Sequence, residues 1–148
     1  MSYFNVRVYG LLLNEQQEIL LSDEFEHNTL FTKFPGGGLE LGEGLIDGLK
    51  REYLEECNAE IEVLQHIYTT DFYEKSSFND SQVISIYYLI KTKQPLQLKF
   101  KTKAFDFDDG CKQSFRWRKL LEIGDDDLTF RTDKAAIHLL REKITDFQ

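Results

Sequence analysis

The chain has 148 residues, of which 41% are hydrophobic and 14% aromatic, enough to bury one hydrophobic core. Its 26 acidic and 18 basic residues give a net charge of −8, which argues against binding to nucleic acid duplexes. The sequence contains no apolar run of roughly 18 residues and no signal peptide, so we expect no contact with a membrane. We therefore expect a single domain over 1–148, located in the cytoplasm.

The two cysteines, Cys57 and Cys111, are not spaced like metal ligands. Reduced thiols are the expected state, in keeping with a cytosolic protein, and a disulfide between the two is the alternative. Neither cysteine is therefore assigned to a candidate site.

The first third of the sequence predicts β-structure. Residues 4–13 form a long apolar run, 14–17 are polar, and 18–25 are apolar again, a pattern typical of a β-hairpin. A further short strand is expected at 30–34. Pro35 and the three glycines that follow it are strong breaking signals, so we expect them to form a loop.

From Leu45 to Cys57 the apolar residues recur with helical spacing, which predicts an α-helix. The elements expected after it are strands at 60–73, 81–93, 96–105 and 114–117, a helical turn at 119–123 and a helix at 132–144. A helix is the alternative for the first half of 60–73. Thr132 or Asp133 is the expected N-cap of this last helix. The order of elements predicts an α/β (α+β) fold in which a mixed sheet lies between helices.

Three glutamates share one face of the first expected helix. Glu52, Glu55 and Glu56 stand at positions i, i+3 and i+4, so their carboxylates lie close together. Such clustering destabilises a helix by roughly a few tenths of a kcal/mol per pair, and Arg51 relieves part of this. A divalent cation would relieve far more, because carboxylate oxygens are preferred ligands of Mg²⁺ and Mn²⁺.

A glycine-rich segment precedes this helix. Gly37 and Gly38 allow a close approach between the backbone and a ligand. Glu43 lies near the expected start of the helix, where the helix dipole favours a carboxylate. The segment and the helix together therefore predict one site.

Residues 37–59 resemble the Nudix box, G-x5-E-x7-R-E-U-x-E-E-x-G-U, in which U is an aliphatic residue. The first glycine, the arginine and the four glutamates of the motif are all present. Tyr53 and Ala59 stand at aliphatic positions, and Asn58 replaces the second glycine. Asparagine is the next-best residue for the left-handed conformation that ends helices, so this replacement is mild.

The resemblance implies an α/β/α sandwich with a central mixed sheet. It also implies a metal-dependent pyrophosphohydrolase that uses Mg²⁺ or Mn²⁺ to cleave a phosphoanhydride bond. The implied substrate is a small phosphorylated molecule, a nucleoside diphosphate linked to another group, such as a nucleotide or a nucleotide sugar. Many members of the family are dimers, so a homodimer is one expectation.

The resemblance also implies roles for individual residues. Glu52, Glu55 and Glu56 would be the metal ligands, and Arg51 would orient their carboxylates through an ion pair. Glu43 would support the loop–helix junction. Gly37 and Gly38 would shape the substrate loop. Glu55 and Glu56 are also expected to be catalytic. The general base is open: Glu55 is one candidate, and Asp108 or Asp109 in the acidic turn at 106–109 is another, for which a solvated turn is the alternative.

Aromatic residues follow the box. Phe72, Tyr73 and Phe78 could stack on a nucleobase, and packing on the sheet is the alternative. The cations Arg7, Lys33 and Arg116 could each reach a phosphate, but the sequence does not place them. His27, His66 and His138 show no ligand spacing and are expected at the surface or in the core.

Two other functions are compatible with the sequence. The first is a Nudix domain that senses a nucleotide without cleaving it, although such domains usually have a degraded box. The second is a solvated acidic helix face without affinity for metals. Hydrolysis is the preferred prediction because all the charged positions of the box are intact.

Overall fold

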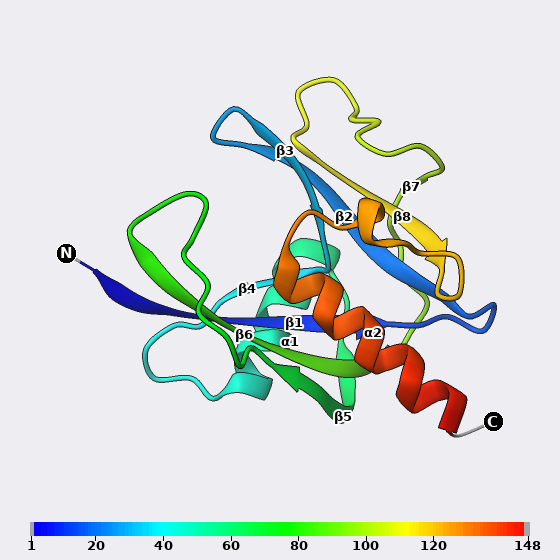
Figure 1. Ribbon diagram of the computed structural model, residues 1–148. Coiled ribbons are helices and arrows are strands. Elements are labelled where there is room, and N and C mark those ends of the chain that lie inside the picture. The colour runs from blue at the N-terminus through cyan, green and yellow to red at the C-terminus, as the bar shows by residue number, and fades with distance from the viewer. Residues whose placement is uncertain (1, 147–148) are drawn as a thin grey trace.

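The computed structural model describes residues 2–146, which form two four-stranded sheets and two α-helices (Figure 1). One sheet has the order β4-β1-β6-β5 and the other the order β3-β2-β8-β7. The strands are β1 (Tyr3–Leu12), β2 (Glu18–Glu26), β3 (Thr29–Lys33), β4 (Gly36–Gly38), β5 (Ile61–Thr69), β6 (Ser81–Thr92), β7 (Phe100–Lys101) and β8 (Gln113–Lys119). The helices are α1 (Leu45–Cys57), the short 3-10 helix η1 (Asp125–Asp127) and α2 (Arg131–Asp146).

Both sheets are mixed, because β1 pairs with β6 and β7 with β8 in parallel while the other pairs are antiparallel. In Figure 1, α2 lies in front of β1 and α1 behind it. Alternate residues of β1 point to the two helices: Val8 packs in the cluster of α1, and Tyr9 in the cluster of α2. The predicted sandwich is confirmed, with its mixed sheet divided into two.

The predicted hairpin between 4–13 and 18–25 is wrong. Strands β1 and β2 belong to different sheets, and an isolated bridge between Leu13 and Ile19 is the pairing described between their ends. One edge of β1 pairs with β6 from Tyr3 to Leu12, and the other pairs with β4 from Arg7 to Tyr9. The sequence pattern could not reveal this, because the competing partners are distant in the chain.

The hairpin is instead formed by β2 and β3. His27 and Asn28 connect them with φ values of 49° and 58°, and Glu26 pairs with Thr29. Two consecutive left-handed residues are characteristic of tight hairpin connections, and asparagine tolerates this conformation well. The His-Asn pair between two apolar runs was the missed signal.

The three glycines form strand β4 rather than the predicted loop. Gly36, Gly37 and Gly38 pair with Tyr9, Val8 and Arg7 of β1. Gly36 has φ +150°, and a Cβ there would lie 2.2 Å from the Val8 carbonyl oxygen. A side chain at this position would therefore strain the backbone and clash with β1.

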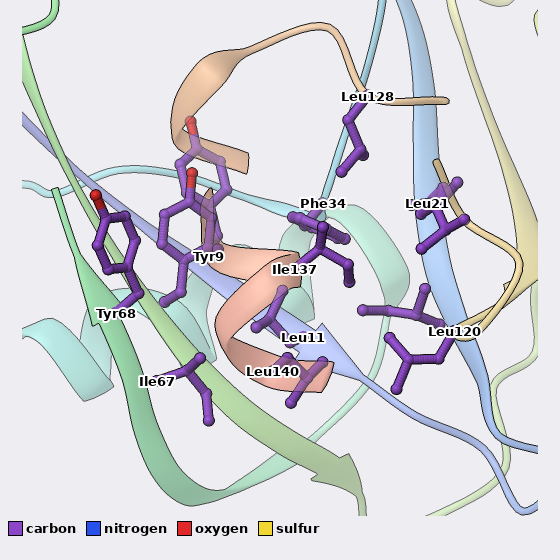
Figure 2. Packing of buried hydrophobic residues seen from close by; sticks show 14 residues of the cluster. Tyr9, Leu11, Leu21, Phe34, Ile67, Tyr68, Leu120, Leu128, Ile137 and Leu140 are labelled. Carbon is purple, nitrogen blue, oxygen red and sulfur yellow. The ribbon is translucent and has the colours of Figure 1, made fainter. Parts of the chain in front are cut away.

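Helix α1 spans the predicted residues, and Asn58 ends it. Asn58 adopts the left-handed conformation (φ 49°, ψ 40°). Its N–H donates to the Leu54 carbonyl, and the Ala59 N–H donates to the Tyr53 carbonyl. Helix α2 begins at Arg131, so the predicted N-cap is wrong, since Thr132 and Asp133 lie in the first turn. Figure 2 shows Ile137 and Leu140 of α2 packed in the core cluster.

The region between β6 and β8 contains little regular structure. Of the strand predicted at 96–105, Phe100–Lys101 pairs with β8. Cys57 is buried and Cys111 exposed, and both are free, as expected. No helix within residues 2–146 is long and apolar enough to cross a membrane.

Candidate active site

A cavity of about 460 Å³ opens between β1, β3, β4, the segment 74–79 and the start of α2. This volume lies in the usual range of small-molecule sites. One part of its lining is charged, with Arg7, Glu24, Lys33, Glu52 and Glu56 beside the glycine strand, and another part is aromatic. Of the predicted site residues, it brings together Gly37, Gly38, Glu52 and Glu56.

Arg51 holds the start of α1 against β4. Its Nη2 donates to the Gly38 carbonyl at 2.9 Å and to Glu43 Oε1 at 2.6 Å, and its Nε donates to Glu43 Oε2 at 2.9 Å. Its Nη1 lies 3.0 Å from Glu52 Oε1 and 3.3 Å from Glu55 Oε2. The planar guanidinium thus arranges three carboxylates of the box at once.

The interaction with Arg51 determines how Glu43 titrates. Hydrogen bonds from Arg51 and from the Glu40 backbone N–H lower the pKa of Glu43 to about 2. The hydrogen bonds to Glu43 and Glu52 in turn raise the pKa of Arg51. Both groups therefore remain charged at neutral pH, and the predicted support of the loop–helix junction has a structural basis.

Gly37 makes room for the Glu52 carboxylate. A Cβ at Gly37 would lie 2.6 Å from both Cδ and Oε1 of Glu52. The side chain of Glu52 is only 13% exposed and faces the cavity. The absence of a side chain at this position of the box therefore leaves space for the Glu52 carboxylate.

Glu56 lies deeper than the other glutamates of the box. Its Oε2 is buried and has no hydrogen-bond partner among the described residues. Burial raises the pKa of Glu56 to about 7, and Glu24 and Glu52 add to this, whereas Lys33 opposes it. A buried carboxylate oxygen without a partner is costly, and a bound cation would compensate for it.

The predicted metal ligands do not converge fully. Within residues 2–146 no group of three His, Cys, Asp or Glu residues is arranged to hold an ion. Glu55 is 60% exposed, and Arg51 lies between it and Glu52. The carboxylate chemistry and the unpartnered Oε2 of Glu56 nevertheless fit a hard divalent cation.

Lys33 is a buried cation next to these carboxylates. Its Nζ lies 3.1 Å from Glu24 Oε2 and 3.3 Å from the Phe34 and Gly36 carbonyl oxygens. Burial alone would lower the pKa of Lys33, but the carboxylates of Glu56 and Glu24 outweigh it and raise the pKa. Sequence reasoning named Lys33 without placing it.

The aromatic part of the lining comes from three elements distant in sequence. Phe78 lies 5.3 Å from Phe31 and 6.2 Å from Phe130 between ring centroids, and His27 lies 5.2 Å from Phe78. All four line the cavity. Phe31, Phe130 and His27 were not predicted as site residues, because their side chains meet only in the folded chain.

Two predicted substrate-binding residues lie elsewhere. Phe72 packs against the core, with the Arg131 guanidinium 5.0 Å from its ring centroid. Tyr73 is 65% exposed and lines a smaller neighbouring pocket. Neither is among the residues that line the main cavity, whereas Phe78 is.

The acidic turn also lies outside the cavity lining. Asp108 Oδ1 pairs with Lys101 at 2.8 Å and with Lys99 at 3.1 Å, which lowers the pKa of Asp108. Asp109 is exposed. This arrangement fits the solvated turn that was the alternative to a catalytic loop.

Asp133, considered in the sequence only as a cap, lines the cavity. Its Oδ1 accepts a hydrogen bond from the Tyr87 hydroxyl, and its Oδ2 is buried without a described partner. Burial raises the pKa of Asp133 to about 7, while the Tyr87 hydrogen bond and the charges of Lys33 and Arg7 oppose the shift. No sequence pattern indicated a buried carboxyl here.

Comparison with known proteins identifies the class. The profile of the NUDIX domain matches residues 4–140, so the chain belongs to this family. This membership confirms the resemblance drawn from the box and agrees with the expected enzyme class, a hydrolase acting on phosphoanhydride bonds. A search of curated protein sequences gave no match.

Solved structures show the same fold. The E. coli ORF135 protein superposes with a TM-score of 0.72 at 17% identity, over 95% of this chain and 91% of that one. The MutT protein of Methanosarcina mazei Go1 gives 0.72 at 20% identity, over 96% of each chain. An ADP-ribose pyrophosphatase of Streptococcus suis gives 0.62 at 16% identity, over 97% of this chain and 92% of that one.

Proposed function

We propose that the protein is a divalent-metal-dependent pyrophosphohydrolase whose substrate is a small molecule containing a nucleoside diphosphate. The observation that carries this proposal is the cavity that joins Glu52 and Glu56 of the box to a group of aromatic rings. Its charged part suits a diphosphate and its cations, and its aromatic part suits a planar base.

Glu52, Glu55 and Glu56 would hold the cation, which is proposed to be Mg²⁺ or Mn²⁺. When bound, it would neutralise the phosphate charge and lower the pKa of a bound water. Arg51 orients the carboxylates of Glu52 and Glu55, and Gly37 leaves space for Glu52. Gly37 and Gly38 would let the substrate approach the backbone, as the motif implies.

We propose Glu55 as the general base. Its carboxylate is 60% exposed, whereas Oε2 of Glu56, the other catalytic candidate on α1, is buried. Glu55 can therefore exchange a proton with solvent. Asp108 is the weaker candidate, because Lys101 and Lys99 occupy its carboxylate. Glu55→Gln would then lower kcat while leaving the affinity for the substrate within a few-fold.

The test is a substrate panel with Mg²⁺ or Mn²⁺ on the wild type and on Glu56→Gln. The panel contains nucleoside triphosphates, ADP-ribose, nucleotide sugars and dinucleoside polyphosphates. Glu56→Gln should lower turnover by roughly 100-fold or more, because a carboxylate in the cation site is lost. The matched control is Glu62→Gln, an exposed residue of β5 paired with Lys91.

A second measurement distinguishes the alternatives. Calorimetric titration with Mn²⁺ should show binding to the wild type and weaker binding to Glu56→Gln. Nucleotide binding without any hydrolysis would favour a sensing domain. No Mn²⁺ binding at all would favour an acidic helix face without a metal.

A further inference from the structure

Arg7 lies on β1 beside the glycine strand. It pairs with Gly38 of β4 on one edge and with Ser85 of β6 on the other, and all three residues line the cavity. A Cβ at Gly38 would lie 3.6 Å from Arg7 Nη1. The missing side chain at Gly38 therefore leaves the guanidinium open to the cavity.

An aromatic stack holds the guanidinium in place. Arg7 Nε donates to the Tyr9 hydroxyl oxygen at 2.6 Å, and Arg7 Cζ lies 5.8 Å from the centroid of the Tyr9 ring. Tyr9 stacks on Tyr87 at 5.4 Å, and the Tyr87 hydroxyl donates to Asp133. Arg7 is thus anchored through Nε alone.

The two Nη groups of Arg7 have no hydrogen-bond or ion-pair partner among residues 2–146. Other cations around the cavity differ in this respect. Lys33 uses its three N–H groups on Glu24 and two carbonyls, and Arg131 is paired with Glu74 and the Tyr73 carbonyl. Lys75 differs in another way, because its side chain is exposed to solvent and no hydrogen bond or ion pair with a described residue fixes it. Arg7 therefore offers the cavity a fixed pair of unused donors.

We propose that Arg7 binds a phosphate group of the substrate through its Nη1 and Nη2 donors. This inference rests on the proposed function and adds a phosphate-binding residue that lies outside the box. A guanidinium can donate two parallel hydrogen bonds to a phosphate, a geometry that an ammonium cannot reproduce. The neighbouring Glu52 carboxylate lies in the proposed cation site, so Arg7 and the cation would contact the same diphosphate.

The first part of the test uses a probe that needs no turnover. Binding of imidodiphosphate, a non-hydrolysable diphosphate, is measured by calorimetry in the presence of Mn²⁺. Arg7→Gln should weaken this binding by roughly 10- to 100-fold, as expected for a charge-assisted hydrogen bond. Arg7→Lys should restore part of the affinity, and Mn²⁺ binding without the probe should stay unchanged in both variants.

The second part uses any substrate that the wild type hydrolyses. Arg7→Gln should raise KM by roughly tenfold or more, and Arg118→Gln should leave KM unchanged. Arg118 is a suitable control because it pairs with Glu122 and Asp127, away from the cavity lining. Circular dichroism and urea unfolding verify that each variant is folded.

The possible results separate the two proposals. Turnover by the wild type with unchanged imidodiphosphate affinity and KM in Arg7→Gln would overturn the role of Arg7 alone. Loss of Mn²⁺ binding in Arg7→Gln would also overturn it, because Arg7 would then position Glu52. Tight imidodiphosphate binding that depends on Arg7, without turnover of any substrate, would support Arg7 and overturn the proposed hydrolysis.

Discussion

The Glu43 carboxylate beside Arg51 and the carboxyls of Glu56 and Asp133 in the cavity have pKa values shifted in opposite directions. Around Arg51, Glu43 is partly exposed, has hydrogen bonds to both oxygens and has its pKa lowered to about 2. In the cavity, Glu56 and Asp133 each have a buried oxygen without a partner, and burial raises each pKa to about 7. The local supply of donors, rather than the residue type, decides which carboxylate is ready to accept a ligand.

This contrast assigns different tasks to the two groups. The cluster around Arg51 is already satisfied, so it stabilises the junction between β4 and α1. The cavity carboxyls are left unsatisfied, which costs stability but leaves oxygen atoms available to a cation or a donor group. Natural proteins commonly accept such a cost at functional sites.

The largest effect on stability is expected from Arg51→Met. This change removes the cation that bonds Glu43, Glu52 and Glu55, and it leaves their charges close together. We expect a loss of about 2 to 3 kcal/mol, between the values for exposed and fully buried pairs. Urea unfolding measures it, and Arg51→Lys should recover part of the loss. An unchanged free energy of unfolding would contradict the stabilising role.

The next effect is a gain in stability from Asp133→Asn. Because the folded pKa of about 7 exceeds the ordinary 3.8, the native state holds a proton that the unfolded chain has lost. The contribution of Asp133 to wild-type stability should therefore be fully present below about pH 4 and be lost as the pH rises through about 7. Near pH 8 the variant should be more stable by about 1 to 2 kcal/mol.

Urea unfolding at pH 4 and pH 8 checks this sign. The two proteins should differ little at pH 4, since the carboxyl is then neutral in both states. Tyr87, Lys33 and Arg7 are the ionisable groups that influence Asp133, and they are unchanged in the variant. Glu56, whose pKa is also raised, should retain a pH dependence of the same direction in the variant. A larger gain at pH 4 than at pH 8 would contradict the prediction.

The smallest effect on stability is expected from Gly37→Ala. The new Cβ would meet the end of the flexible Glu52 side chain, which can move, so the change should be below about 1 kcal/mol. The affinity for Mn²⁺ should nevertheless fall by roughly tenfold, because Glu52 is displaced. Gly38→Ala is the matched control, since its Cβ would make an ordinary 3.6 Å contact. Equal Mn²⁺ affinities in the two variants would contradict the proposed space for Glu52.

Local sequence patterns predicted part of the fold and of the site. The spacing of apolar residues predicted α1 with its observed bounds, and the glutamates at 52, 55 and 56 do share one face of it. The strands at 61–69 and 81–92 and the last helix were also expected, with ends shifted by a few residues. These features depend on neighbours within a few positions, which the sequence contains.

Strand pairing and the rest of the cavity lining could not be predicted in the same way. The expected hairpin failed because β4 and β6 compete for the edges of β1. Phe31, Phe78 and Phe130 come from separate segments, and no local pattern marks them as neighbours. Arg7 and Lys33 were recognised as cations, but only the fold shows which of their donors are already used.

The sequence by itself determined the family, helix α1 and the shared face of Glu52, Glu55 and Glu56. It could do so because residues at positions i, i+3 and i+4 of any α-helix lie on the same face. Only the tertiary structure decided the environment of each carboxylate. Glu43 accepts hydrogen bonds from Arg51 of α1 itself. Glu56 is buried beside Lys33 of β3 and Glu24 of β2, which are distant from α1 in sequence. Burial and donor supply are properties of packed surfaces, so they appear only when the chain is folded.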